Sequence, residues 1–292
     1  MTTMAEPQIV TPEKPGFHKD VDFDTYVSWD AANASILNRF QRTPAHVKYE
    51  LDHGGKKRTG ALDLGWLTHL AVLEPARFES EVVVPPKVDR RTKAGKATWA
   101  QFEAEHPDAM LVDMQTHAKV RAMRRNILEH ETAGEFFSGT GANELSVLWN
   151  DEEHGVRCKA RIDRVSTIGE WPIVGDLKTS RSAARRGFEK SINDFGYHVQ
   201  AAHYLAGLEA IVPVPPGQPF RRFVFFVVES EPPHCVAVYE IDDAALAEGV
   251  LVRSRYLRQW RECVETGNWY GFPAGIEYAS LPAWAFRRYE DM

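Results

Sequence analysis

The spacing of apolar residues along the chain changes from a helical period to an alternating one near residue 140. Before that point, the pattern predicts helices over residues 28–52 in two pieces, 59–73, 97–106 and 113–130. Ser28 or Asn33 is suited to cap the first helix, and Pro44 to begin its second piece. A short strand is predicted at residues 82–84, and a mobile loop at the basic, glycine-containing residues 86–97.

After residue 140, alternation predicts three successive strands joined by tight turns, over residues 144–150, 156–165 and 171–178. The remaining pattern predicts a helical stretch at 183–211 interrupted near Gly196, apolar strands at 220–229 and 235–241, and an amphipathic helix at 242–266. Helices followed by an antiparallel meander, a helix and two strands indicate an α+β fold. We expect a central mixed sheet flanked by helices.

The chain has 292 residues, a length that suits one large domain or one domain with an accessory lobe. Residues 1–24 are polar and proline-containing, and we expect them to form a flexible tail. The expected domain spans residues 25–292. Its expected parts are a helical part at 25–135, the sheet with its flanking helices at 140–266, and an aromatic C-terminal tail at 267–292.

Composition excludes several classes of protein. No apolar run approaches the roughly 18 residues of a membrane span, and the N-terminus lacks the apolar core of a secretory signal. Cys158, Cys235 and Cys263 are far apart in sequence and have no iron–sulfur spacing. We therefore expect a cytoplasmic protein without a disulfide framework, an iron–sulfur cluster or a membrane partner.

The net charge of −6 argues, taken alone, against binding to a polyanion. Positive residues nevertheless occur in clusters, at residues 56–58, 87–96, 121–125 and 181–186. We predict that the second cluster contacts a phosphate backbone through Arg90, Arg91, Lys93 and Lys96, and that Arg181 contributes as well. The alternative is that each cluster is a solvated surface.

Charged residues interrupt the predicted meander at Asp163, Asp176 and Lys178. Asp176 and Lys178 are two apart on one strand and point to one face, and Asp163 on the preceding strand is within reach of the same place. Two carboxylates and a lysine are what a Mg²⁺ site and its attacking water require. The alternative for an isolated Asp-x-Lys sequence is a salt bridge at a strand end.

Four further residues are candidates for the same site. Glu144 begins the first strand of the meander, although it is equally suited to an exposed strand end. Gln200 and Tyr204 lie four apart and therefore on one face of the following helix. His69 lies in an apolar helix, where a lone histidine is more often a core residue with a satisfied hydrogen bond.

In this order, the residues resemble the motif series of RecB-type and lambda-exonuclease-type nucleases of the PD-(D/E)xK superfamily. The similarity is strongest to the RecE-like exonucleases of prophage origin. It is carried by the stretches SWDAANASILNRFQRTPAHVKYEL, TGALDLGWLTHLAVLEPARF, DRRTKAGKATW, GVRCKARIDRV and IVGDLKTS. These stretches cover most of residues 25–205. The four-cysteine cluster of some RecB-type relatives is absent.

The resemblance implies a PD-(D/E)xK core and a role for each candidate residue. His69, Asp163, Asp176 and the backbone carbonyl of Leu177 would hold Mg²⁺, for which Mn²⁺ would substitute. Lys178 would be catalytic, and Glu144 would be an acidic residue of the site. Gln200 and Tyr204 would support the site or the DNA end.

The resemblance further implies an exonuclease that degrades linear double-stranded DNA from 5′ to 3′ for phage-type recombination. A RecT-type single-strand annealing protein would be its partner. Two alternatives stay open: an endonuclease or RNA-acting relative, and a DNA-end-binding module without catalysis. Asp163, Asp176 and Lys178 are all present, which disfavours the second alternative.

Relatives of this type form closed rings around DNA, and the resemblance implies a homo-oligomer here. The aromatic C-terminal residues offer area for such an interface: Trp269, Tyr270, Phe272, Trp284 and Phe286. The alternative is that these side chains cap the core of a monomer.

Overall fold

A computed structural model describes residues 11–53, 64–107, 109–212 and 222–281. The fold is built on one six-stranded sheet with the strand order β1-β4-β5-β6-β7-β8. Its strands are β1 (Gly16–His18), β4 (Ala142–Asp151), β5 (Val156–Ile168), β6 (Trp171–Ser180), β7 (Phe223–Glu229) and β8 (Val236–Glu240). The β6–β7 pair is parallel and every other pair is antiparallel. The expected mixed sheet is confirmed.

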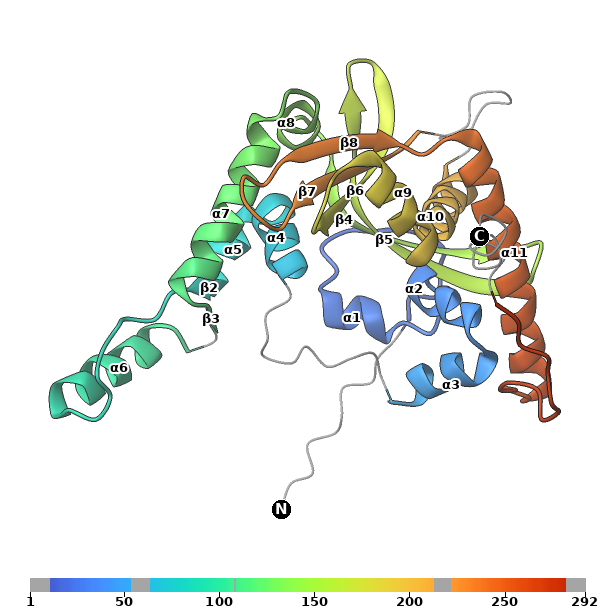
Figure 1. Ribbon diagram of the computed structural model, residues 1–292, viewed down its shortest axis with the longest axis horizontal. Helices are drawn as coiled ribbons and strands as arrows, with labels where there is room; N and C mark the ends of the chain where they lie inside the picture. The colour runs from blue at the N-terminus through green and yellow to red at the C-terminus, as the bar shows by residue number, and fades with distance from the viewer. Residues whose placement is uncertain (1–10, 54–63, 108, 213–221, 282–292) are drawn as a thin grey trace, which may run out of the picture.

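Eleven α-helices and a 3₁₀ helix lie in the described part of the chain (Figure 1). The α-helices are α1 (Phe23–Ser28), α2 (Ala34–Leu37), α3 (Pro44–His53), α4 (Leu64–Leu73), α5 (Pro75–Glu81), α6 (Lys93–Glu105), α7 (Met114–Glu129), α8 (Glu131–Ser138), α9 (Arg185–Asp194), α10 (Tyr197–Ile211) and α11 (Asp243–Thr266). The 3₁₀ helix η1 (Asn38–Gln41) follows α2. A second, two-stranded parallel sheet pairs β2 (Val82–Val83) with β3 (Met110–Leu111).

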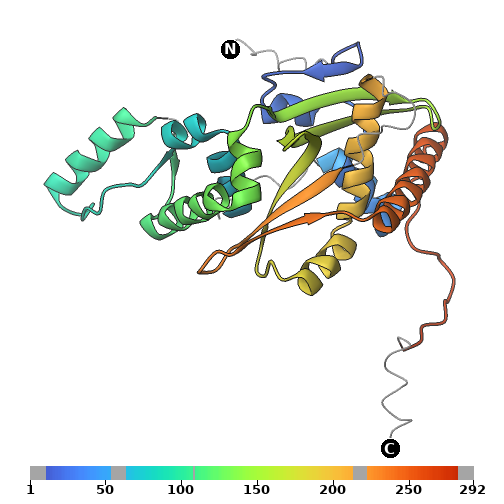
Figure 2. The same ribbon diagram turned by 90° about the horizontal axis from the view of Figure 1, so that it is seen from above.

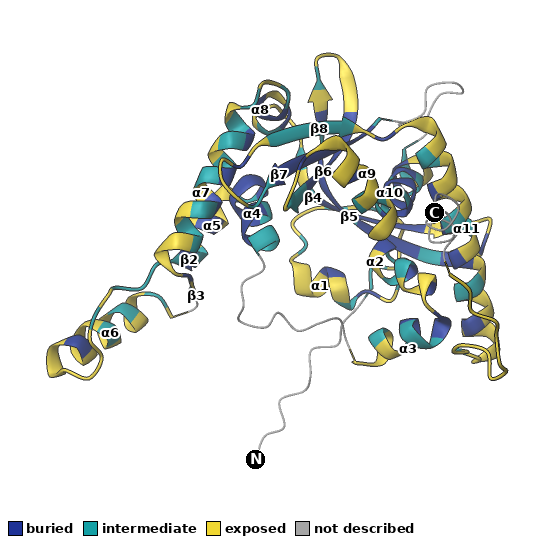
Figure 3. Ribbon diagram, viewed as in Figure 1, coloured by how far each residue is buried: buried dark blue, intermediate teal, exposed yellow. Residues whose placement is uncertain are grey.

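The main sheet is covered on both faces, and its central strands are the most deeply buried part of the molecule (Figure 3). On one face, α9, α10 and α11 pack on apolar side chains of β4 to β7, around residues such as Trp149 and Phe225. On the other face, α4, α7 and α8 pack on β6 and β7, around Phe136 and Leu177. Because strands in the middle of this sandwich are buried on both sides, they appear in the sequence as nearly continuous apolar runs.

Local sequence explains where several elements begin. The side chain of Asn33 accepts a hydrogen bond from the backbone N–H of Ile36 at 2.9 Å and caps α2. Gly196 separates α9 from α10 with φ of +66°, and a Cβ there would lie 2.6 Å from Oδ1 of Asn38. This position requires glycine, both for its left-handed conformation and for its close approach to α2 and η1.

The structure corrects two sequence-based expectations. Residues 11–24 are not a flexible tail, because β1 forms hydrogen bonds with β4 at the edge of the sheet. Residues 86–97 are not all loop, because Thr92 caps α6 and the helix begins at Lys93. The structure also adds a helix that the sequence pattern did not predict, α5, which begins at Pro75 because proline is well suited to the first turn of a helix.

The aromatic tail packs within its own chain at its start. The rings of Trp260 and Trp269 meet edge to face at 6.1 Å, and the carbonyl of Tyr270 accepts a hydrogen bond from the backbone N–H of Ala45 at 3.0 Å. Phe272 is largely exposed. Trp284, Phe286 and the basic residues 56–58 lie outside the described residues. No helix in the described part of the chain is long and apolar enough to cross a membrane.

Candidate metal and phosphodiester site

The site forms where β5 and β6 separate. Their antiparallel ladder runs from Ile168↔Trp171 to Arg164↔Gly175 and ends there, although β6 continues to pair with β7 through Ser180. The next residues on the two strands are Asp163 and Asp176. Beyond the last pair, the backbone groups of Leu177 are no longer paired with β5. Side chains, instead of the backbone of β5, form hydrogen bonds with them.

Both backbone groups of Leu177 are bonded to candidate site residues. The N–H of Leu177 donates to Oδ2 of Asp163 at 2.8 Å, and its carbonyl accepts from Nε2 of His69 at 2.5 Å. Buried backbone groups require such partners, so the strand separation itself holds these two side chains in place. The Leu177 carbonyl, expected as a metal ligand, is thus a hydrogen-bond acceptor for His69.

His69, Glu144 and Asp163 form a compact cluster. One ligand atom from each residue lies within 4.8 Å of the others, and Nδ1 of His69 is 3.5 Å from Oδ2 of Asp163. The pairs that flank Glu144 on β4 place it opposite Asp163 on β5. Glu144 has a φ of +49°, a strained conformation for a residue with a side chain. The structure therefore brings Glu144 into the site with a local distortion of β4.

Asp176 lies beside this cluster but belongs to a second group of contacts. Its Oδ2 is 2.5 Å from Nζ of Lys178, and its Oδ1 accepts from Nε2 of Gln200 at 2.7 Å. Oε1 of Gln200 accepts from Lys178 at 3.0 Å, and its Nε2 also lies 3.0 Å from the hydroxyl of Tyr204. Gln200 and Tyr204 thus share one face of α10, as their spacing predicted, and they orient the Asp176–Lys178 pair.

Burial and charge shift the pKa values of these groups. Burial, followed by the negative charge of Asp176, raises the pKa of Asp163. Burial, followed by the charge of Asp163, raises the pKa of Glu144. Burial lowers the pKa of His69. Burial alone would lower the pKa of Lys178, but Asp176 and Asp163 raise it overall. Burial and mutual repulsion therefore disfavour the ionised forms of Asp163 and Glu144.

The hydrogen bonds also determine where lone pairs point. His69 donates from Nε2 to a carbonyl, so its neutral ring has an unprotonated Nδ1. That lone pair lies 3.5 Å from Oδ2 of Asp163. A nitrogen and carboxylate oxygens that face one another in this way fit a divalent cation, and the bond from Nε2–H to a carbonyl is the usual support of a metal-binding histidine.

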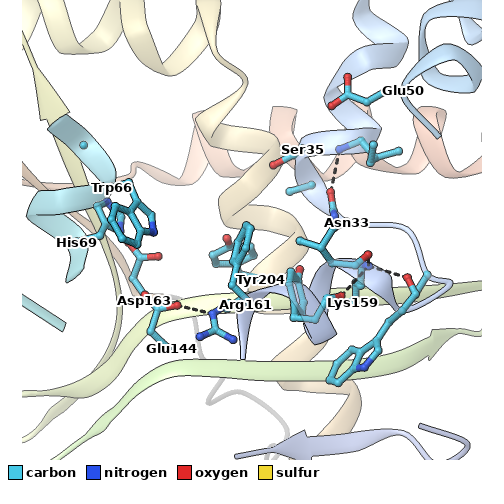
Figure 4. Close-up of a pocket in the computed structure, with 18 of the residues that line it drawn as sticks. Asn33, Ser35, Glu50, Trp66, His69, Glu144, Lys159, Arg161, Asp163 and Tyr204 are labelled. Atoms are coloured by element: carbon cyan, nitrogen blue, oxygen red, sulfur yellow. Dashed lines mark hydrogen bonds and ion pairs between the residues drawn. The ribbon is translucent and has the colours of Figure 1, made fainter. Parts of the chain in front are cut away.

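The cluster lines one side of a cleft of about 750 Å³ (Figure 4). Figure 4 shows His69 and Trp66 on α4 at one side, Asp163 and Glu144 on the sheet below, and Tyr204 on α10 behind. The opposite side of the cleft is formed by α1, α2 and α3, including Asn33 and Glu50. The cleft gives a substrate access to the cluster.

The residues predicted to contact phosphates lie elsewhere. Arg90, Arg91, Lys93 and Lys96 are exposed at and before the start of α6, and Arg181 is exposed directly after β6. None of them lines the cleft.

Two further cleft residues, Lys159 and Arg161, were not among those predicted from the sequence. Arg161 forms an ion pair with Glu144, and its Nη1 donates to the carbonyl of Val21 at 2.5 Å. Lys159 is buried and donates to three backbone carbonyls at the end of α1, at 2.6 to 2.9 Å. A signal was present, because Lys159, Arg161 and Asp163 alternate with apolar residues on a buried strand. Such a charged stripe requires partners.

The family model for the PDDEXK-like domain of unknown function DUF3799 matches residues 33–281. No curated protein matches the chain. Among solved structures, the chain is similar to a candidate exonuclease from Eubacterium rectale, at 14% sequence identity and a TM-score of 0.49, with 82% of each chain covered. It is also similar to the protein SSO0001, at 17% identity and a TM-score of 0.28, over 74% of this chain and 84% of the other. The family match confirms the expected superfamily fold, and the chain belongs to the DUF3799 family of PDDEXK-like domains.

Proposed function

We propose that this protein is a metal-dependent nuclease that hydrolyses phosphodiester bonds of DNA. The observation that carries the proposal is the separation of β5 and β6, at which a cluster of lone-pair donors lines an open cleft and the largely buried pair of Asp176 and Lys178 lies beside it. A structural salt bridge would not require the additional histidine and two more carboxylates. The expected Mg²⁺ fits the hard oxygen donors of this site.

Each residue has a distinct task in the proposed reaction. His69, Glu144 and Asp163 would hold the ion, with Asp176 beside them. When bound there, the ion supplies Lewis-acid polarisation of the phosphate and lowers the pKa of a bound water. Lys178 is an ammonium at neutral pH, because two carboxylates raise its pKa. It therefore serves as a cation that orients the attacking water and offsets phosphate charge. Gln200 holds Lys178 and Asp176 in place.

The finer proposal is a RecE-like exonuclease that acts 5′ to 3′ on linear duplex ends in the cytoplasm. Its support is the motif series from His69 to Tyr204. On the same basis we propose a homo-oligomeric ring and a RecT-type annealing partner. Light scattering after size exclusion, at micromolar protein with and without duplex DNA, tests the ring. A 33.1 kDa monomer under both conditions would refute it.

The substrate test uses linear duplexes labelled at either 5′ end or 3′ end, beside a closed circular duplex, a single strand and a duplex RNA. An exonuclease of this polarity releases the 5′ label first from linear DNA and leaves the circle intact. Cleavage of the circle would instead identify an endonuclease, and preference for RNA an RNA-acting relative. Absence of cleavage of every substrate with Mg²⁺ or Mn²⁺ would refute the proposed function.

Metal binding is expected to strengthen as pH rises. The pKa values of Asp163 and Glu144 are raised in the folded state. At a pH above the ordinary carboxyl pKa, these two residues are therefore more often protonated in the folded chain than in the unfolded chain. Without metal, their contribution to stability is present at low pH and is lost as pH rises. A metal ion reverses this effect by favouring the ionised forms.

The increase in melting temperature on adding Mg²⁺ or Mn²⁺ is therefore expected to grow between about pH 5.5 and about pH 8.5. Differential scanning calorimetry measures it, and Asp163→Asn serves as the variant without the response. A metal-induced increase that is equal at all pH values would contradict this assignment of ligands.

A further inference from the structure

An arm extends from the body of the molecule between β2 and β3. It comprises residues 84–107 and contains α6, which stands apart from the sheet and its covering helices in both views (Figures 1 and 2). Of the thirteen residues of α6, only Gly95 is buried. The arm therefore contributes little to the core, and its defined shape needs another explanation.

The base of the arm packs against the helix that carries His69. Val82 in β2 and Val112 after β3 pack in one apolar cluster with Leu67, Leu70 and Ala71 of α4. The same helix carries His69. The base of the arm is thus packed on the helix that lines the cleft, although the tip of the arm lies outside the cleft.

The tip of the arm is a locked turn. The carbonyl of Asp89 accepts from the backbone N–H of Thr92 at 3.1 Å and from its hydroxyl at 3.0 Å, and that hydroxyl accepts from the N–H of Gly95 at 3.0 Å. A Cβ on Gly95 would lie 2.1 Å from the Asp89 carbonyl oxygen. The guanidinium of Arg90 stacks on the ring of Trp99 at 4.0 Å. The turn is ordered by its own contacts without a core behind it.

The locked turn presents a concentrated positive charge. Residues 87–96 contain five cations and one carboxylate, all exposed: Lys87, Arg90, Arg91, Lys93, Lys96 and Asp89. The whole chain, in contrast, carries a net charge of −6. A positive patch on an otherwise negative protein is suited to bind a polyanion with closely spaced charges. Because the tip is already ordered, binding costs little conformational entropy there.

We infer that the arm is a second nucleic-acid contact, which binds the phosphate backbone of a duplex at a distance from the metal site. The inference rests on the proposed function for its choice of polyanion. The arm binds without base readout, because lysine and arginine contacts to phosphates carry no sequence information. Its role is to hold the duplex while the cleft acts on one phosphodiester.

The test compares Lys93→Gln/Lys96→Gln with Arg255→Gln/Arg258→Gln, a control with the same change of charge. The control residues are exposed on α11, at the opposite end of the molecule from α6 (Figure 1). Binding to a short blunt-ended duplex is measured in EDTA across a range of salt concentrations. The arm variant is expected to bind about tenfold or more weakly, and the control is expected to match wild type. The log–log salt slope of the arm variant should fall by about 0.9 for each phosphate that it no longer neutralises.

A wild-type salt slope and affinity in the arm variant would overturn the inference. Loss of self-association with unchanged duplex binding would also overturn it, because the arm would then bind an acidic surface of a second copy. EDTA prevents metal-dependent cleavage, so the assay measures duplex binding alone. The inference about the arm and the proposed nuclease function can therefore fail independently of each other. A protein that binds duplex through the arm but cleaves no substrate would refute only the proposed function.

Gly95→Ala tests the shape of the tip without changing its charge. Alanine is otherwise favoured over glycine in a helix by about 1 kcal/mol, so the helix itself should remain. The variant is expected to bind duplex more weakly, because its Cβ cannot coexist with the Asp89–Thr92 turn. Wild-type affinity in this variant would overturn the requirement for a locked turn.

Discussion

Replacing Lys178 with glutamine is expected to lower the turnover of phosphodiester cleavage by about 10²-fold or more. The ammonium of Lys178 lies between Asp176 and Gln200 and above the ring of Tyr197 at 4.3 Å. These three groups fix its position beside the cluster. Since Lys178 does not belong to the cluster of His69, Glu144 and Asp163, metal binding should persist in this variant.

Turnover is measured on labelled linear duplex at saturating Mg²⁺, and metal binding by isothermal calorimetry on the same sample. Lys190→Gln, on the exposed surface of α9, is the matched control and should cleave at the wild-type rate.

The Asp176→Asn variant is expected to lose cleavage altogether. Asparagine is preferable to alanine there, because it retains a polar partner beside the buried ammonium of Lys178. Wild-type turnover in either Lys178→Gln or Asp176→Asn would contradict the assigned site.

Replacing Arg253 with methionine is expected to destabilise the fold by about 3–5 kcal/mol. Arg253 is buried on α11, forms an ion pair with Asp151 at the end of β4, and donates from Nε to Nδ1 of His203 at 3.2 Å. Asp151 also accepts from His154, whose other ring nitrogen lies 2.9 Å from the hydroxyl of Ser254. Methionine would leave the largely buried carboxylate of Asp151 and the buried imidazole of His203 without their shared partner.

The free energy of unfolding is measured by urea titration. Arg258→Met, exposed on the same helix, is the control and should change it by no more than about 0.5 kcal/mol. A decrease below about 1 kcal/mol in Arg253→Met would mean that the network is well solvated and does not join α11 to the sheet. Cleavage per folded molecule should be retained, because this network does not line the cleft.

Local patterns were sufficient to predict most of the sheet and the relative positions of several candidate site residues. The alternation that predicted strands at 144–150, 156–165 and 171–178 is observed in β4, β5 and β6. Side chains alternate along any strand and recur every four residues on any helix. For that reason the positions of Asp176 relative to Lys178, and of Gln200 relative to Tyr204, followed from sequence spacing alone.

The short β1 strand and the independent shape of the arm could not be predicted in the same way. β1 has only three residues, and its stability comes from hydrogen bonds to β4, which is more than a hundred residues later in the chain. The start of α6 depends on the Thr92 cap and the close approach of Gly95 to Asp89. In the sequence, the same residues resembled a basic loop because they carry no apolar periodicity.

The sequence by itself determined the strands of the meander, the break at Gly196 and the residue types of the candidate metal and phosphodiester site, because each depends on near neighbours in the chain. The tertiary structure alone decided how these residues meet. It ends the β5–β6 ladder beside Asp163, turns Glu144 toward that carboxylate, and packs α4 on β6 so that His69 reaches the Leu177 carbonyl. The physical reason is that buried backbone groups and charges must find partners, and those partners are chosen by packing between segments that lie far apart in the sequence.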